Sequence, residues 1–218
     1  MSTPLHYNDI KYLKYMINPK WIPDPTILTG ELIDLVPLEK AHLPELCKIA
    51  TDPKIWEFYL GNWAVESRFI EVYHAVLEKK EKNEEYPFII YHKPSARIIG
   101  STRLMDMSKQ DNRLEIGGTW LQVKYWATAI NFDCKLALLK FCFENLAVNR
   151  VQLKTQHDNI RSRKAIEKIG GIYEGVIRQH ILKEDGSYRS SAYFSILKEE
   201  WPIVKTKLEL LLRNKMEI

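Results

Sequence analysis

The sequence predicts an α+β domain that contains one mixed β-sheet. Three segments in the middle of the chain are rich in β-branched and aromatic residues, which favour strands. Apolar residues at three-and-four spacing occur on both sides of these segments, which indicates amphipathic helices. A strand-like pair near the end flanks Asp185-Gly186, a dipeptide typical of a tight hairpin turn. One domain at residues 27–218, preceded by an arm at residues 1–26, accounts for this order.

Composition limits the class of protein. The 218 residues are 45% hydrophobic and 28% charged, which is typical of a globular protein with a full core. Lys and Arg exceed Asp and Glu by only 32 to 28, and the basic residues are dispersed, so no nucleic-acid partner is expected. This modest basic excess suits a small anionic ligand.

The cysteines and the first residues of the chain predict a reducing environment inside the cell. Cys47, Cys134 and Cys142 are odd in number and have no metal-ligand spacing, so neither a disulfide framework nor a metal site is expected. They are interpreted as reduced thiols of the core. Residues 1–16 break each apolar run with a polar residue, which predicts neither a secretory signal nor a membrane-spanning helix. A cytoplasmic location without a membrane partner is the expectation.

The elements follow in order from an N-terminal arm. Residues 4–26 combine aromatic side chains with Pro19, Pro23 and Pro25, which favours an extended arm over a helix. Residues 27–38 (ILTGELIDLVPL) alternate well enough to predict a first strand.

Two helices are expected next. Apolar residues between positions 43 and 50 indicate a short helix. The second helix is clearer, because one face repeats at helical spacing before a charged tail. The residues of this face are Phe69, Val72, Tyr73, Val76 and Leu77.

The middle of the chain changes period. Residues 88–93, 96–107 and 113–123 are predicted to form a three-stranded meander. Residues 132–146 are apolar on most of the circumference of a helix, which indicates burial on several sides. Residues 150–157 return to strand character.

The last third of the chain predicts a helix, a hairpin and a final helix. Residues 159–171 form a helical pattern that stops at two glycines. Residues 176–183 and 188–197 are the strands of the hairpin. Pro202 suits the first turn of the last helix, which carries Val204, Leu208 and Leu211 on one face.

A candidate site lies at KYWATAIN (124–131), between the third meander strand and the buried helix. The first N–H groups of a helix have no partner within it and face the preceding turn. A turn of this kind is therefore a ready site for an anion.

The run from Glu115 to Leu146, followed by RVQLKTQHDNIRSRKAIEKIGGIYEGVIRQH (150–180), resembles the GNAT acetyltransferase superfamily, in particular its ribosomal-protein N-terminal acetyltransferases. The resemblance covers residues 27–200. It implies a mostly antiparallel sheet with helices on both faces, acetyl-CoA as cosubstrate, no metal, and direct transfer of an acetyl group to a primary amine. It also makes a homodimer plausible.

The resemblance assigns cofactor-binding roles to main-chain groups of the strand and the turn. Leu121 and Val123 would meet the acetyl and pantetheine part, and the turn would hold the pyrophosphate. The residues of the turn are Trp126, Ala127, Thr128, Ala129, Ile130 and Asn131.

Two residues of this turn depart from the family pattern. Ala127 and Ala129 stand where relatives usually have glycine. A methyl group there costs about 1 kcal/mol where φ must be positive, and nothing where φ is helical.

The resemblance also suggests catalytic residues. Glu115 matches an acidic position near the incoming amine, where it could take a proton, although a surface glutamate beside a basic residue explains it as well. Asn159 would bond the pantetheine arm and Ser162 would help to protonate the thiolate, although Asn159 could simply cap its helix. Ile166 occupies the place of the tyrosine that many relatives use as an acid.

Three further side chains are weaker candidates for chemistry. His180 could act as a base, although a sheet histidine with satisfied hydrogen bonds explains it better, and His157 is weaker still. Cys134 stands near a helix start, but packing inside the apolar helix explains it better.

Two functions remain open from the sequence. One is an acetyltransferase that acts on a small amine or a protein N-terminus, with an acceptor pocket between the early helices and the hairpin. The other is a binding module that keeps affinity for CoA and has lost turnover. An RNA-binding domain lacks support, because no basic stripe alternates with aromatic residues.

Overall fold

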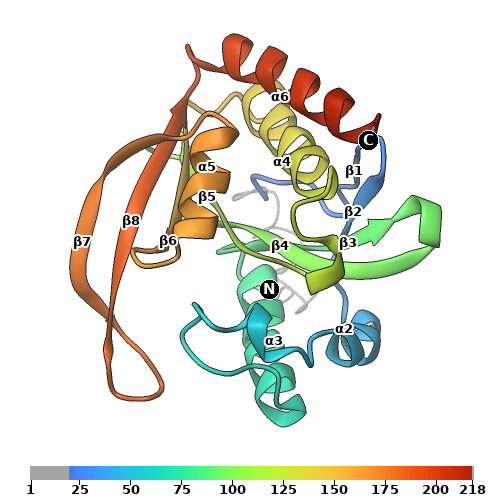
Figure 1. Ribbon diagram of the computed structural model, residues 1–218, viewed down its shortest axis with the longest axis vertical. Helices are drawn as coiled ribbons and strands as arrows, with labels where there is room; N and C mark the ends of the chain where they lie inside the picture. Colours follow the sequence, from blue (N-terminus) through green and yellow to red (C-terminus); the bar gives the residue numbers. More distant parts are fainter. Residues whose placement is uncertain (1–19, 218) are drawn as a thin grey trace, which may run out of the picture.

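The structure is a computed structural model that describes residues 20–217 of the chain (Figure 1). Its strands are β1 (Leu28–Thr29), β2 (Ile33–Pro37), β3 (Tyr86–His92), β4 (Arg97–Ser108), β5 (Arg113–Leu121), β6 (Arg150–Gln156), β7 (Ile172–Leu182) and β8 (Tyr188–Leu197). Its α-helices are α2 (Leu43–Ile49), α3 (Glu66–Glu81), α4 (Ile130–Lys140), α5 (Ile160–Lys168) and α6 (Trp201–Met216). The predicted order of elements is therefore observed from the first helix onward.

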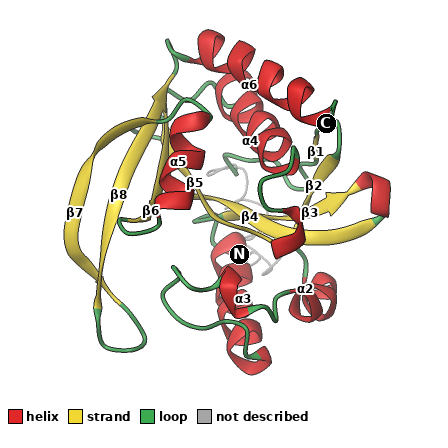
Figure 2. Ribbon diagram, viewed as in Figure 1, coloured by secondary structure: helices red, strands yellow, loops and turns green. Residues whose placement is uncertain are grey.

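The strands of this described region form a single sheet with the order β1-β2-β3-β4-β5-β6-β8-β7. Neighbouring strands are antiparallel except for β5 and β6, which run parallel. Figure 2 shows this sheet with helices distributed around it. The prediction of one mixed, mostly antiparallel sheet is confirmed.

Two apolar cores lie on the two faces of the sheet. Leu114 and Ile116 of β5 belong to a core that includes α4, α6 and Ile166 of α5. Trp120 of the same strand belongs to a second core that includes α2 and α3. Regular alternation would keep these three even-numbered positions on one face. The pairing of β4 with β5 is irregular between Gly117 and Trp120, where Gly118 has φ 55°, so Trp120 turns to the other face and β5 contributes to both cores. The expectation of helices on both faces is confirmed.

The prediction of one strand at residues 27–38 is wrong, because the segment forms two short strands joined by a turn. Asp133 in the first turn of α4 explains the turn. Its carboxylate accepts hydrogen bonds from the N–H groups of Glu31 (3.0 Å), Leu32 (2.7 Å) and Ile33 (3.1 Å). A carboxylate that is distant in sequence therefore fixes the local conformation.

Two further details differ from expectation. The helix predicted at 132–146 is α4 followed by a π-helical turn at Phe141–Asn145. The hairpin between β7 and β8 does not use two central residues with positive φ, since only Gly186 of the predicted pair has one (φ 81°). The Gly186 N–H donates to the carbonyl of Lys183, so the turn extends over more than two residues.

Most of the predicted arm, residues 1–19, lies outside the described residues. The remainder packs on its own domain, because Ile22 is 3% exposed and belongs to the core around α4. The Tyr86 hydroxyl donates to Asp24 (2.7 Å) and accepts from the Thr26 N–H (2.9 Å). None of the helices in the described part of the chain combines the length and apolar character that a membrane crossing requires.

Candidate active site at the splayed strands

The parallel strands β5 and β6 separate within the sheet. Their pairing covers only Arg113 to Glu115 on β5, with Arg150 to Gln152 on β6. Beyond that point β5 pairs with β4, and β6 pairs with β8. The edge of β5 that faces β6 is therefore open from Ile116 onward.

Main-chain donors of β5 point into this opening. The Gln122 N–H donates to the Ile99 carbonyl (2.9 Å) on β4. Successive N–H groups of an extended chain point in opposite directions. The N–H groups of Leu121 and Val123 therefore face away from β4, toward the opening. This orientation suits the role that the sequence predicted for them.

The turn at residues 123–131, called the cofactor turn below, joins β5 to α4. Within residues 20–217, five of the six main-chain N–H groups from Ala127 to Phe132 have no hydrogen-bond acceptor. They belong to Ala127, Thr128, Ala129, Asn131 and Phe132. The Ile130 N–H is instead bonded to the Thr128 hydroxyl (3.3 Å). Free N–H groups at a helix N-terminus fit a phosphate group.

The two alanines of the cofactor turn have different conformations. Ala127 has φ 59°, in the left-handed region where a Cβ atom is unfavourable. Ala129 has φ −63° and ψ −21°, a helical conformation at the N-cap of α4. Glycine would therefore relieve strain at one position and loosen the chain at the other.

An arginine and a tryptophan join the cofactor turn to α5. The Trp126 indole N–H donates to the Leu121 carbonyl (3.0 Å), which fixes the ring over the end of β5. The Arg161 guanidinium carbon lies 3.6 Å from the centre of that ring, a cation–π contact. Burial lowers the pKa of Arg161. The first turn of α5 and the cofactor turn therefore lie side by side.

Asp133 joins the first turn of α4 to the turn between β1 and β2. It is 1% exposed and accepts the three N–H bonds from the turn between β1 and β2. Addition of a Cβ atom at Gly30 would place it 2.4 Å from the Asp133 carboxylate, so glycine is required beside it. The position of the free N–H groups depends on this buried link.

Asn159 and Ser162 form the cap of α5. The Asn159 side-chain oxygen accepts the Ser162 N–H (3.0 Å), which is an N-cap, and Asn159 is 9% exposed. This confirms the capping interpretation and leaves the Asn159 amide nitrogen and the Ser162 hydroxyl for other contacts. Ile166 is buried in the core around α4, so the place of the family's tyrosine is a packing position.

Glu115 does not lie on the surface. It is 1% exposed, and its carboxylate accepts from Gln152 (2.9 Å) and pairs with Lys154 (3.0 Å). Because Leu114 and Ile116 belong to the core around α4, Glu115 points to the opposite face of the sheet. No hydrogen bond between Glu115 and Ser162 is found in the described structure, so these two predicted catalytic residues are not in direct contact.

Side chains of β6 and β8 extend the face on which Glu115 lies. Strand pairing places Lys154 opposite Tyr193, and Gln156 opposite Ser191. We call this surface the charged wall, and its members are Glu115, Gln152, Lys154, Arg189, Ser191 and Tyr193. His180 of β7 borders it, since its Nε2 lies 3.4 Å from the Tyr193 hydroxyl.

The cysteines and His157 are the remaining candidates for chemistry. Cys47, Cys134 and Cys142 are free and buried. Burial raises the pKa of the Cys134 thiol to about 12, which excludes a thiolate near neutral pH. His157 directly follows β6, where its main-chain N–H donates to the Ser190 carbonyl (2.9 Å), while its buried Nδ1 has no hydrogen-bond partner among the described residues. Across residues 20–217, no group of three or more His, Cys, Asp or Glu side chains is arranged to hold a metal ion.

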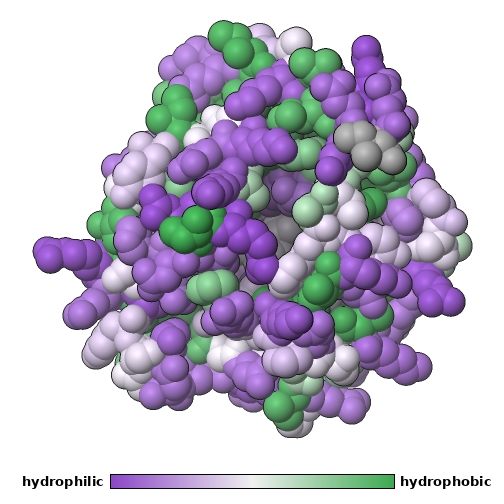
Figure 3. Space-filling model, in the orientation of Figure 1, coloured by the Kyte–Doolittle hydropathy of each residue, from purple (hydrophilic) through white to green (hydrophobic). Residues whose placement is uncertain are grey.

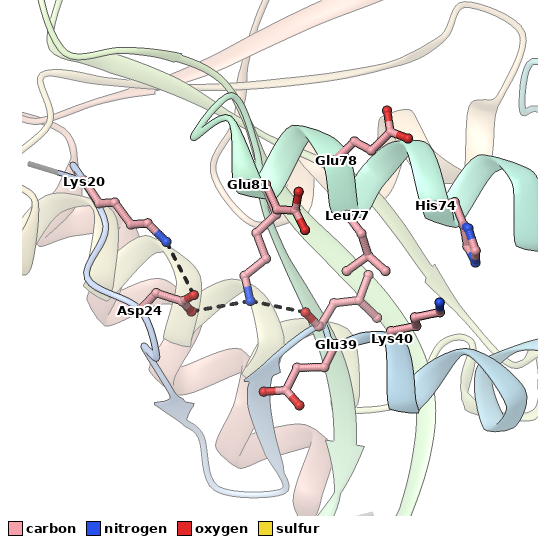
Figure 4. A pocket seen from close by; sticks show the side chains of 10 residues that line it. Lys20, Asp24, Glu39, Lys40, His74, Leu77, Glu78 and Glu81 are labelled. Carbon is pink, nitrogen blue, oxygen red and sulfur yellow. Dashed lines mark hydrogen bonds and ion pairs between the residues drawn. The ribbon is translucent and has the colours of Figure 1, made fainter. Parts of the chain in front are cut away.

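A recess is visible near the splay. Figure 3 shows a hollow between the positions that α5 and the start of α4 occupy in Figure 1, with hydrophilic side chains along its α5 side. A separate cavity of about 390 Å³ lies between α3 and the segment before β1 (Figure 4). Its Lys80 amine pairs with Asp24 (3.4 Å) and donates to the Leu38 carbonyl (3.2 Å). Because its charged centre is already paired and no predicted site residue lines it, this cavity is not the candidate site.

One mostly antiparallel sheet, with a parallel pair of strands that separates at its centre, defines the class of fold. Residues 33–172 match the family model described as the acetyltransferase (GNAT) domain. This match covers more than half of the chain. The chain belongs to the GNAT acetyltransferase family. The resemblance, the fold class and the acetyltransferase class predicted from the sequence are confirmed at this level, and the family uses acetyl-CoA.

Individual relatives agree with this membership. The "putative ribosomal N-acetyltransferase YdaF" of Bacillus subtilis is 30% identical over 104 residues, which span 48% of this chain and 56% of that protein. The match thus spans little more than half of that relative. A putative acetyltransferase of T. thermophilus superposes with a TM-score of 0.78 at 30% identity, over 88% of this chain and 99% of that chain.

A more distant solved structure shares the fold. RimJ of Mycobacterium smegmatis, in complex with CoA-disulfide, has a TM-score of 0.71 at 17% identity, over 88% of this chain and 96% of that chain. At this identity the comparison concerns architecture alone.

Sequence reasoning missed several residues of the site. Asp133 and Lys135 were visible as charges inside an apolar helix, which indicates buried partners. Lys135 is 6% exposed and donates to the Thr119 hydroxyl (2.9 Å), and burial lowers its pKa. Arg161, Lys154 and Arg189 had no comparable indication, because single basic residues on strands and helices are common.

Proposed function

We propose that this chain transfers an acetyl group from acetyl-CoA directly to a primary amine, on a protein N-terminus or a small molecule. The observation that carries the proposal is the set of free N–H groups at the cofactor turn, next to the opening between β5 and β6. A diphosphate is an anion of the size and charge that such a corner fits. The altered glycine positions leave these donors in place.

The chain's own residues would take the following parts. Residues 126–131 and Asn159 would hold the cofactor, and the N–H groups of Leu121 and Val123 would hold the acetyl carbonyl oxygen. Bound acetyl-CoA would supply the acetyl group as a thioester.

Two residues are proposed for proton transfer. Glu115 would take the proton that the amine nitrogen loses when its bond to the acetyl carbon forms, directly or through water. Ser162 would return a proton to the sulfur when the carbon–sulfur bond breaks. Because Glu115 is held by Gln152 and Lys154, transfer through a water molecule suits its geometry better than direct contact.

Acetyl-CoA titration with an amine panel tests this function. The melting temperature should rise with acetyl-CoA, and free CoA should be released only when an amine is present. The name of YdaF makes ribosomal-protein N-terminal peptides the first acceptors to test. Stabilisation without CoA release on any amine would favour the binding module, which is the second candidate because of the strained Ala127. Absence of stabilisation at saturating acetyl-CoA would remove both.

A cytoplasmic location, a homodimer and the division into an arm at residues 1–26 and a domain at residues 27–218 remain part of this proposal. Light scattering of the purified full chain, at several concentrations, measures whether it forms a dimer.

A further inference from the structure

Arg189 of β8 is a half-buried cation without a matching anion. Its Nε donates to the Ser191 hydroxyl (2.9 Å), which turns the side chain back along the strand. Within residues 20–217, it forms no ion pair and its terminal nitrogens have no hydrogen-bond acceptor. Burial lowers the pKa of Arg189, and this desolvation is larger than the opposing effect of nearby anionic groups. A partly desolvated guanidinium whose terminal nitrogens have no acceptor among the described residues keeps these donors available to an anion.

The position of Arg189 relates it to the reaction site. Its bond to Ser191 keeps it on the charged wall, because Ser191, Tyr193 and their partners on β6 share that face. Glu115, Tyr59 and Tyr193 lie close enough to Arg189 to influence its pKa. The Tyr59 hydroxyl donates to the Thr119 carbonyl (2.9 Å), in the part of β5 that has separated from β6. Arg189 therefore faces the opening between these strands.

Three carboxylates of the described residues, of which Glu115 shares the charged wall with Arg189, already have cations. Glu115 pairs with Lys154 (3.0 Å). Glu85 pairs with Lys79 (2.8 Å) and with an arginine of β4 (2.9 Å). Glu184 in the hairpin turn pairs with Arg68 of α3 (2.6 Å). Since Glu115 is paired with Lys154, Arg189 is a surplus positive charge on the charged wall.

We infer that Arg189 binds a carboxylate of the acceptor, so that the preferred substrates are amines that carry a carboxylate close to the reacting nitrogen. This inference rests on the proposed acetyl transfer and names its substrate class. The planar guanidinium matches a carboxylate through two parallel hydrogen bonds. A site built for such a group rejects the matching amide, because buried donors are then left without a charged partner. Two sources share this chemistry, namely free α-amino acids and peptides with an acidic N-terminal residue.

Matched acceptor pairs test the inference. The first arm compares alanine with alaninamide, and the second compares amidated peptides that begin with Asp or with Asn. In the comparison that contains the natural class of acceptor, kcat/KM should be about tenfold or more higher for the substrate with the carboxylate than for the matching amide. The ratio should fall to about one in Arg189→Gln and in Arg189→Met, while the KM for acetyl-CoA stays unchanged. The control Arg213→Gln removes the same charge from an exposed site on α6 and should keep the ratio.

A binding measurement separates this inference from the transfer reaction itself. N-acetylalanine or the N-acetyl-Asp peptide should raise the melting temperature of the CoA-loaded protein more than the matching amide does. That difference should disappear in both Arg189 variants. Circular dichroism spectra that match the spectrum of the natural protein will show that the variants are folded. Equal binding and equal rates for carboxylate and amide in the natural protein would overturn the inference, as would a preference that survives loss of Arg189. Failure of acetyl-CoA to stabilise the protein would instead overturn the proposed function.

Discussion

The cofactor turn and the charged wall border the same opening between β5 and β6, but they are built from different groups. The cofactor turn offers N–H groups of the main chain, and its side chains are mostly apolar. The charged wall offers side chains whose charges are nearly balanced, with Arg189 as the exception. A main-chain site tolerates the replacement of glycine by alanine as long as the backbone keeps its course. A side-chain site changes its chemistry with every substitution, so cofactor and acceptor specificity can vary independently.

The largest effect is expected when the backbone of the cofactor turn loses its anchor. Asp133→Ala removes the acceptor of three N–H groups, one of them buried. The free energy of unfolding should fall by about 3 kcal/mol or more, since each unsatisfied buried donor costs about 1–3 kcal/mol. Asp133→Asn keeps one oxygen acceptor and should lose less. Urea unfolding measures both variants, and equal stability of Asp133→Ala and the natural protein would show that the anchor is dispensable.

A smaller but still large effect is expected from the charged wall. Glu115→Gln should lower kcat about 100-fold, because an amide cannot take a proton, while the KM for acetyl-CoA stays within twofold. Glu174→Gln is the matched control, since Glu174 of the edge strand β7 is also an ion-paired carboxylate, bonded to Arg150. A kcat within threefold of the natural value would make Glu115 a structural partner of Lys154 only.

The two alanines of the cofactor turn should respond with opposite signs. Ala127→Gly should raise the free energy of unfolding by about 0.5 kcal/mol, because φ 59° disfavours a Cβ atom. Ala129→Gly should lower it by about 0.5–1 kcal/mol, because the residue is helical. Acetyl-CoA should bind somewhat more tightly to Ala127→Gly and more weakly to Ala129→Gly, as calorimetry can measure.

Ala147 supplies the control for this pair. It has φ 54° at a site before β6, away from the cofactor turn. Ala147→Gly should therefore gain similar stability without a change in acetyl-CoA affinity. The same sign of change in Ala127→Gly and Ala129→Gly would contradict the conformational difference between them.

The smallest effect concerns the ion pair that joins the hairpin to α3. Hydrogen bonding from Arg68 lowers the pKa of Glu184 below its ordinary value of 4.5. A carboxyl group with a lowered pKa in the folded state stabilises the protein above the unfolded-state value, and this stabilisation is lost as the pH falls through the folded-state value. Because the Glu184 side chain is 37% exposed, screening limits the contribution to about 0.5 kcal/mol.

Unfolding of Glu184→Gln at several pH values measures this contribution. The difference from the natural protein should be complete at pH 7 and should shrink as the pH is lowered below about 4.5. Glu199→Gln, at an exposed site between β8 and α6, should show no such dependence. A difference that grows toward low pH would contradict a lowered pKa of Glu184 in the folded protein.

Much of the fold could be predicted because the helices and strands depend on the periodicity of apolar residues within short segments. The helical repeat of Phe69, Tyr73 and Val76 and the buried circumference of α4 appear in the structure as the sequence suggested. The turn between β1 and β2 could not be predicted, because the carboxylate that shapes it lies about one hundred residues later in the chain. The same holds for the candidate site. The cofactor turn could be predicted because its residues are contiguous in sequence, and the charged wall could not because its residues come from separate strands.

The sequence by itself determined the order of elements from the first helix onward, the family and the turn proposed to bind the cofactor, because each depends on neighbours within a few positions or on a contiguous motif. Only the tertiary structure decided that Ala127 is strained and Ala129 is not, that Glu115 is buried beside Lys154, and that Arg189 has no anion. The physical reason is that the electrostatic environment of a charge and the φ angle of a turn are set by groups from several strands, which meet only when the sheet has formed.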